Sequence, residues 1–245
     1  MSLRDPHQVA RRTLVLITLA FRGSLETVRQ TKAVELSVQL LPWLREQKLE
    51  DELDPRERKI LETSFGRLSP SQLNDLRIAG EPVAWFAWAL ERGERPQPQK
   101  WADAMPWITK LAIERPEALA LLDAPQLRDE TELAAAARES AAVATALRQA
   151  RLTERPLGLM TAAKDLLARQ KREQWSPLGI EISDADLSAA AETVAALPVE
   201  QQKQLGRLTF VRELALSWLF DRRPSYYADT AAADDATDAG APASP

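Results

Sequence analysis

The chain has 245 residues, of which 45% are apolar, so it holds enough apolar side chains for one large buried core. It has no cysteine and one histidine, His7, which excludes disulfides and thiol nucleophiles and leaves little for a metal–histidine or Ser-His-Asp site. The net charge of -4 argues against a dedicated nucleic-acid binder, because neutralising phosphates requires a basic surface. None of the eight glycines lies in a phosphate-binding pattern. Because cysteine is absent and histidine occurs once, we predict neither a cofactor nor a metal.

The first candidate element is the apolar run at residues 14–21, LVLITLAF. It is too short for a membrane span, which needs about 20 residues. Arg11 and Arg12 precede the run, but Arg22 follows it directly and no small-x-small cleavage site appears, which argues against a signal peptide. We therefore predict a buried amphipathic helix in a cytoplasmic protein that does not enter a membrane.

Capping residues and prolines mark the expected helix starts. Asp5-Pro6, Asp54-Pro55 and Ser69-Pro70 place a capping side chain before a proline at the first helical position, and Ser183 begins a later helix. Apolar residues follow each start at spacings of three and four, the helical period. The pattern predicts helices at residues 6–21, 24–47, 55–64, 70–77, 81–92, 98–114, 124–149, 157–173, 184–196 and 199–220.

Breaks in this pattern are few. Pro42 and Pro106 are expected to bend or break their helices. Residues 179–182, GIEI, form the best strand candidate, but a lone strand has no partner, so an extended connector is expected there. Residues 230–245 are rich in Ala, Asp and Thr and too poor in apolar side chains to offset the entropy of ordering. We expect a single compact all-α, multi-helix domain over residues 1–229, followed by a disordered tail at 230–245.

Two of the expected helices should be central. Residues 83–90, VAWFAWAL, carry no charge, and a helix that is apolar on all sides must be surrounded by other elements. Residues 205–220 carry an apolar stripe that includes Trp218. The alanine-rich segment 132–150 favours helix and permits close approach, which suits an interior strut. Trp85, Trp88 and Trp218 are accordingly expected in the core.

Three stretches resemble the uncharacterised bacterial family called domain of unknown function 4272. They are GEPVAWFAWALERGERPQP at 80–98, LRDETELAAAARESAAVATALRQARL at 127–152, and VRELALSWLFDRRPSYYADT at 211–230. The second ends in the family's Arg-x-Ala-Arg pattern, and the third is similar to its "E-R-x-x-A-L-N-W-L" helix. The resemblance implies an all-helical fold and supplies no reaction. The chain departs from the family pattern at polar positions, which implies an altered polar site.

The best candidate polar cluster is Glu81 with Arg212 and Glu213, because all three adjoin tryptophan-bearing helices. A carboxylate among buried aromatic side chains can have a raised pKa and act as an acid or base. The structural interpretation is simpler and is preferred. Glu81 lies in a first helical turn, where a negative charge favours the helix dipole, and Arg212 is then its ion-pair partner or a surface residue.

Trp101 and Trp107 are the candidate partner-binding residues. They adjoin the polar loop ERGERPQPQK at 91–100, so they are expected to reach the surface, where tryptophan often anchors a protein partner. The basic helix containing Lys164, Arg169, Lys171 and Arg172 is more typical of a solvated face than of a nucleic-acid site.

The leading hypothesis is a non-catalytic, cytoplasmic protein–protein interaction or accessory module. The alternative is a carboxylate-dependent hydrolase or lyase built on Glu81 and neighbouring acids such as Asp103. That alternative requires Glu81 to lie in a concave pocket near a second carboxylate, and pairing with arginine argues against it. The third hypothesis, a nucleic-acid accessory factor, requires the basic residues of 164–172 to join a continuous patch.

Overall fold

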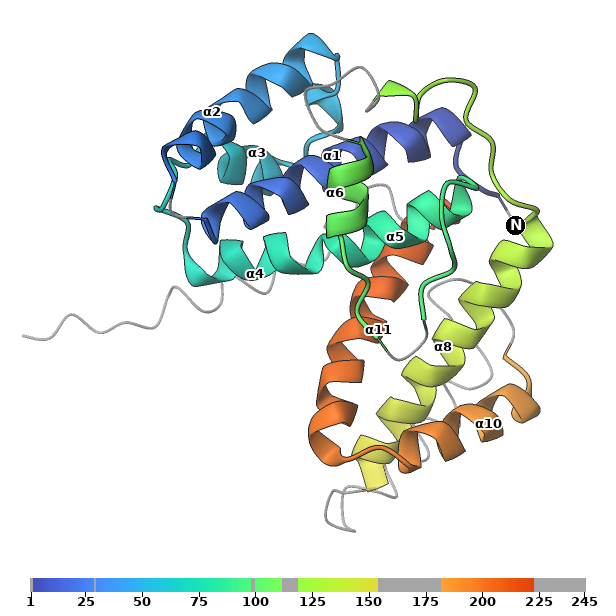
Figure 1. The fold of residues 1–245 in the computed structure, drawn as a ribbon. Helices are drawn as coiled ribbons and strands as arrows, with labels where there is room; N and C mark the ends of the chain where they lie inside the picture. The colour runs from blue at the N-terminus through green and yellow to red at the C-terminus, as the bar shows by residue number, and fades with distance from the viewer. Residues whose placement is uncertain (1, 29, 98–99, 112–118, 154–181, 223–245) are drawn as a thin grey trace, which may run out of the picture.

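The structure is a computed structural model that describes residues 2–28, 30–97, 100–111, 119–153 and 182–222. Within these ranges the chain forms helices and no strand, so the all-α expectation is confirmed (Figure 1). No helix in the described ranges is both long enough and apolar enough to cross a membrane. The helices are α1 Pro6–Glu26, α2 Thr31–Glu46, α3 Pro55–Glu62, α4 Pro70–Ile78, α5 Gly80–Ala89, α6 Met105–Leu111, α8 Glu130–Thr153, α10 Asp184–Ala195 and α11 Val199–Leu219, with a 3-10 turn, η1, at Glu50–Glu52.

Side-chain caps begin the helices where the sequence predicts them. The Asp5 carboxylate accepts hydrogen bonds from the backbone N–H groups of His7 and Gln8 at the start of α1. Asp54, Ser69 and Ser183 each form a capping box with the residue three positions later. These bonds satisfy N–H groups that have no partner inside the helix.

α1 continues five residues beyond its predicted end at residue 21. The predicted helices 6–21 and 24–47 leave residues 22 and 23 between them, but Gly23 lies within α1. A Cβ atom at this position would lie 2.9 Å from the Cβ of Leu76, so the glycine permits close packing of α1 against α4. Gly23 therefore allows α1 and α4 to approach closely and does not end a helix.

Neither of the two prolines expected to bend or break a helix, Pro42 and Pro106, interrupts one. Pro42 lies inside α2 and has no N–H to donate to the carbonyl oxygen of Val38, four residues earlier. Val38 is 69% exposed, so a water molecule can donate to this carbonyl instead. Pro106 is the second residue of α6, a position where a missing N–H costs little. α8 begins at Glu130, later than predicted, because Asp129 accepts a hydrogen bond from the Thr131 N–H and caps it there. The predicted helix at 157–173, residues 179–181 of the connector and the tail at 230–245 lie outside the described residues.

The core is built around α5, in which every residue is buried. α1 packs along α5, and α11 contacts the same helix (Figure 1). The rings of Phe86 on α5 and Trp218 on α11 are 5.2 Å apart. Trp85, Trp88 and Trp218 are buried, as expected. A second, smaller apolar cluster joins α8, α10 and the first half of α11. The expectation that α5 and α11 are central is confirmed, and α1 shares that position.

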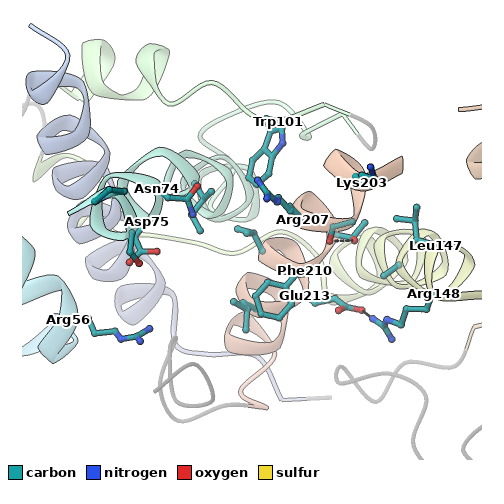
Figure 2. A pocket seen from close by; sticks show the side chains of 18 residues that line it. Arg56, Asn74, Asp75, Trp101, Leu147, Arg148, Lys203, Arg207, Phe210 and Glu213 are labelled. Atoms are coloured by element: carbon teal, nitrogen blue, oxygen red, sulfur yellow. Dashed lines mark hydrogen bonds and ion pairs between the residues drawn. The ribbon is translucent and has the colours of Figure 1, made fainter. Parts of the chain in front are cut away.

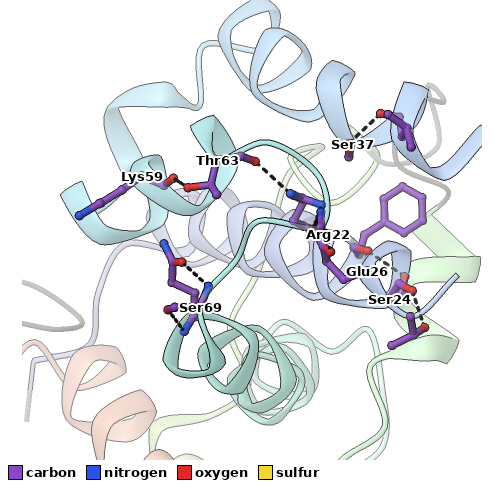
Figure 3. Close-up of polar contacts among 12 residues, drawn as sticks. Arg22, Ser24, Glu26, Ser37, Lys59, Thr63 and Ser69 are labelled. Atoms are coloured by element: carbon purple, nitrogen blue, oxygen red, sulfur yellow. Dashed lines mark hydrogen bonds and ion pairs between the residues drawn. The ribbon is translucent and has the colours of Figure 1, made fainter. Parts of the chain in front are cut away.

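Polar contacts of Arg22 on α1 hold the connection between α3 and α4 (Figure 3). The Arg22 guanidinium donates to the carbonyl oxygen of Thr63 at 3.0 Å and pairs with the Glu26 carboxylate. Glu26 in turn accepts from the Gly66 N–H at 3.1 Å. The connection is thereby tied to α1 immediately before Ser69 caps α4, which fixes where α4 begins.

Candidate functional site

Glu81 and Arg212 form a buried ion pair between α5 and α11. Glu81 is 0% exposed and Arg212 1% exposed, and Arg212 Nε lies 2.5 Å from Glu81 Oε1. The same carboxylate oxygen accepts a hydrogen bond from Trp85 Nε1 at 3.0 Å. The Arg212 guanidinium also lies over the Trp85 ring, 5.7 Å from its centroid. Pairing and hydrogen bonding of this kind offset the cost of removing two charges from water.

The ion pair also holds the backbone on both sides of Trp101. Arg212 Nη2 donates to the carbonyl oxygens of Gln97 and Lys100 at 2.7 and 2.9 Å. Glu81 Oε2 accepts from the Ala102 N–H at 2.7 Å. These backbone groups bond to side chains instead of to a helix, which explains why residues 100–104 are not helical although we predicted a helix from residue 98. The buried charges therefore position an exposed tryptophan.

The chemistry of Glu81 is that of a structural carboxylate. Both of its oxygens accept hydrogen bonds from groups of the protein, and its side chain has no exposed surface. A general acid or base must come within hydrogen-bond distance of the substrate proton that it transfers. The arginine pairing is the arrangement that we expected of a structural Glu81, and it gives no support to the hydrolase or lyase alternative.

A groove lies outside this ion pair, between α4 on one side and α8 and α11 on the other (Figure 2). Its volume is about 1150 Å³. Phe210 of α11 is 52% exposed and Trp101 is 38% exposed, and both line the groove. The full lining is Arg56, Pro70, Ser71, Asn74, Asp75, Ile78, Trp101, Ala144, Leu147, Arg148, Lys203, Gly206, Arg207, Thr209, Phe210, Val211, Glu213 and Leu214.

The charge of the groove is opposite in sign to that of the chain. The lining contains four basic and two acidic side chains, whereas the whole chain has four more acidic than basic residues. Arg148 of α8 pairs with Glu213 of α11, an interaction drawn in Figure 2, and Lys203 pairs with Glu200 at 2.6 Å. The groove thus combines open aromatic side chains with a net positive lining.

One known protein family matches this chain. The family described as "Domain of unknown function (DUF4272)" matches residues 1–169, well over half of the chain. The chain belongs to this family. In this DUF4272 chain the resembling stretches 80–98 and 127–152 fall within the match, and the third stretch, 211–230, lies beyond it. No curated protein and no solved structure matches the chain.

The groove of this DUF4272 chain combines elements inside and outside the family match. α4 and α8 lie within residues 1–169, whereas α11 follows them. Likewise, Glu81 lies within the match and its partner Arg212 lies beyond it. The buried ion pair and the groove therefore both depend on α11 packing against the matched region.

The structure separates the predicted site residues into two places. Glu81 and Arg212 form the buried pair, while Glu213, the next residue of α11, faces the groove. Trp101 lines the groove, but Trp107 is partly buried and packs against the core. Its indole lies so close to Gly93 that a Cβ atom there would come within 2.4 Å of the ring. The basic residues between 164 and 172 lie outside the described residues.

Sequence reasoning missed Phe210 and the basic side chains of α11. One signal was present, since Phe210 lies off the apolar stripe of α11, at a position that the helical period predicts to be exposed. The prediction of no metal site was based on residue types, namely the lack of cysteine and the single histidine. Within the described ranges, no three His, Asp or Glu side chains gather in a way that could hold a metal ion.

Burial raises the pKa of the Glu213 carboxyl above the ordinary glutamate value of 4.5, and the nearby Arg148 charge only partly opposes that shift. The folded chain therefore keeps the Glu213 proton to a higher pH than the unfolded chain does. Because the folded state binds more protons in this window, stability falls as the pH rises from the unfolded pKa through the raised folded pKa.

Glu213→Gln is expected to reduce this fall in stability. We would measure the free energy of unfolding in urea at several pH values from the ordinary glutamate value of 4.5 upward, the direction in which burial moves this pKa. Glu200→Gln, on the same helix but exposed, is the matched control for the exchange of side chain itself. If the free energy of unfolding depends on pH in the same way in the wild-type and Glu213→Gln chains, the pKa of Glu213 is not raised in the folded chain.

Proposed function

We propose that this chain is a non-catalytic protein–protein interaction module of the cytoplasm, and that its partner binds the groove between α4, α8 and α11. The observation that carries the proposal is the pair of open aromatic side chains, Trp101 and Phe210, in a groove with a net positive lining. The core placement of the apolar run at 14–21, which is almost wholly buried within α1, supports its interpretation as part of the fold rather than as a targeting segment.

The size of the groove favours a peptide segment over a small molecule. Pockets for small molecules usually have volumes of about 300–1,000 Å³, and this groove reaches about 1150 Å³. The lining of α11 from Lys203 to Leu214 extends for about 17 Å, at about 1.5 Å per residue. That length accommodates about three turns of a partner helix, the mode in which an amphipathic helix lies in an apolar groove.

The lining also defines the chemistry of the partner. Exposed aromatic side chains in a groove accept an apolar anchor, and such anchors provide most of the binding energy in protein interfaces. Arg56, Arg148, Lys203 and Arg207 favour carboxylates on the partner, although each exposed ion pair contributes only about 0.2–1 kcal/mol. The charges therefore contribute more to the specificity of binding than to its affinity. The expected ligand is an acidic segment with an aromatic or large aliphatic anchor.

Selection from a library of displayed random peptides tests this proposal. Peptides that bind the wild-type chain are collected after removal of those that also bind Phe210→Asp, so that only ligands of the groove remain. We expect the survivors to be acidic and to share a large apolar residue. A selection without survivors, or survivors without acidic residues and an apolar anchor, would contradict it. Survivors that are displaced by nucleic acid would instead favour an accessory factor of nucleic acids.

A further inference from the structure

The net negative charge of the chain is concentrated in one segment. Residues 224–245 contain four aspartates, Asp229, Asp234, Asp235 and Asp238, and no lysine or arginine. Four of the 36 acidic residues and none of the 32 basic residues therefore lie there, which leaves 32 of each in residues 1–223. The segment also contains both tyrosines of the chain, Tyr226 and Tyr227. It has the composition that the groove requires of a ligand: carboxylates and aromatic anchors without opposing positive charge.

The same segment starts within reach of the groove. The described chain ends at Arg222, three residues after α11, and Phe210 lies about 15 Å back along that helix, at about 1.5 Å per residue. Tyr226 and Tyr227 follow Arg222 by four and five residues, so an extended chain carries them about 13–18 Å, at about 3.3–3.6 Å per residue. A chain tethered at this distance has an effective concentration in the millimolar range, so even a weak contact is populated.

We infer that residues 224–245 occupy the groove of their own chain, with Tyr226 or Tyr227 against Phe210 and the aspartates facing the basic lining. The inference rests on the proposed function, because it names an internal occupant for the same surface. A partner segment must then displace residues 224–245 before it can bind. The groove is an autoinhibited docking site, and its availability depends on the charge of this segment.

Distance measurement by electron spin resonance tests the contact in the full chain. The sequence has no cysteine, so Ser71→Cys on α4 and Ala236→Cys in the segment give two unique positions for nitroxide labels. We expect a narrow distance distribution, because a bound segment holds its label at one place, whereas a free segment samples many distances. The matched control carries Asn at positions 229, 234, 235 and 238, which removes the charge but not the length. It should give a broad distribution, as should high salt.

Three outcomes would overturn the inference. They are a broad distribution in the parent chain, an unchanged distribution after the four Asp→Asn substitutions, and the same narrow distribution in a mixture of singly labelled chains, which would place the contact between copies. The selected peptides separate this failure from that of the proposed function. If they bind the groove while the label distribution is broad, the groove is a docking site without the internal occupant. If the inference holds, the four-Asn chain binds those peptides at least about threefold more tightly than the parent chain.

Discussion

Replacing Arg212 by methionine is expected to lower the free energy of unfolding by about 3–5 kcal/mol, because it leaves the Glu81 carboxylate buried without its partner. The loss includes the hydrogen bonds from Arg212 to the carbonyl oxygens of Gln97 and Lys100. Urea unfolding followed by circular dichroism measures the change, and the melting temperature should fall by about 6–20 °C. The environment of Trp101 should change as well, since the pair holds the backbone on both sides of this residue.

Two further variants separate loss of the ion pair from loss of the side chain. Arg207→Met removes an exposed arginine from the same helix and should change stability by no more than about 0.5 kcal/mol. The double variant Glu81→Gln/Arg212→Met removes both charges and should regain part of the loss, because the unpaired buried charge is the main cost. An Arg212→Met chain as stable as the wild type would contradict a structural role for the pair.

Arg12→Met is expected to destabilise the chain by a similar amount, about 3–5 kcal/mol. Arg12 is buried and donates to both oxygens of the buried Glu57 carboxylate, at 2.6 and 2.8 Å. It also donates to the carbonyl oxygen of Glu52 at 3.0 Å. Glu57 itself accepts from the Asp54 N–H in the capping box of α3, so the substitution disturbs a helix start as well as a charge pair.

The neighbouring residue provides a close control. Arg11 pairs with Glu52 at 2.8 Å, but both side chains are partly exposed, so Arg11→Met should cost no more than about 1 kcal/mol. Arg12→Lys keeps the charge but loses the two-pronged geometry and should lie between the two methionine variants. Equal destabilisation by Arg11→Met and Arg12→Met in urea unfolding would show that burial of the pair is unimportant.

The helical fold was predictable because its signals are local. Asp5, Asp54, Ser69 and Ser183 cap helices at the positions where the sequence pattern places them, since a cap involves only residues two or three apart. The end of α1 was not predictable in this way. Gly23 is a typical helix terminator, and only the proximity of Leu76, more than fifty positions away, makes it a packing residue.

The candidate site could be predicted only in part. The sequence indicated Glu81 and Arg212 as possible partners, and Trp101 as a candidate for a surface contact. It also grouped Glu213 with Glu81, although the helical turn directs neighbouring residues to different faces, so that Arg212 points into the core and Glu213 into the groove. The groove joins α4, α8 and α11, which are distant in sequence, so its shape and net positive lining depend on tertiary packing.

Calorimetry with one selected peptide provides the most direct test of the groove as the binding surface. Phe210 and Val199 are both on α11 and are 52% and 54% exposed, but only Phe210 lines the groove. We expect Phe210→Asp to weaken binding by about 30-fold or more, the effect of removing about 2 kcal/mol from an anchor contact. Val199→Asp should leave the affinity unchanged. Equal affinities for the two variants, or a loss confined to Val199→Asp, would contradict binding in the groove.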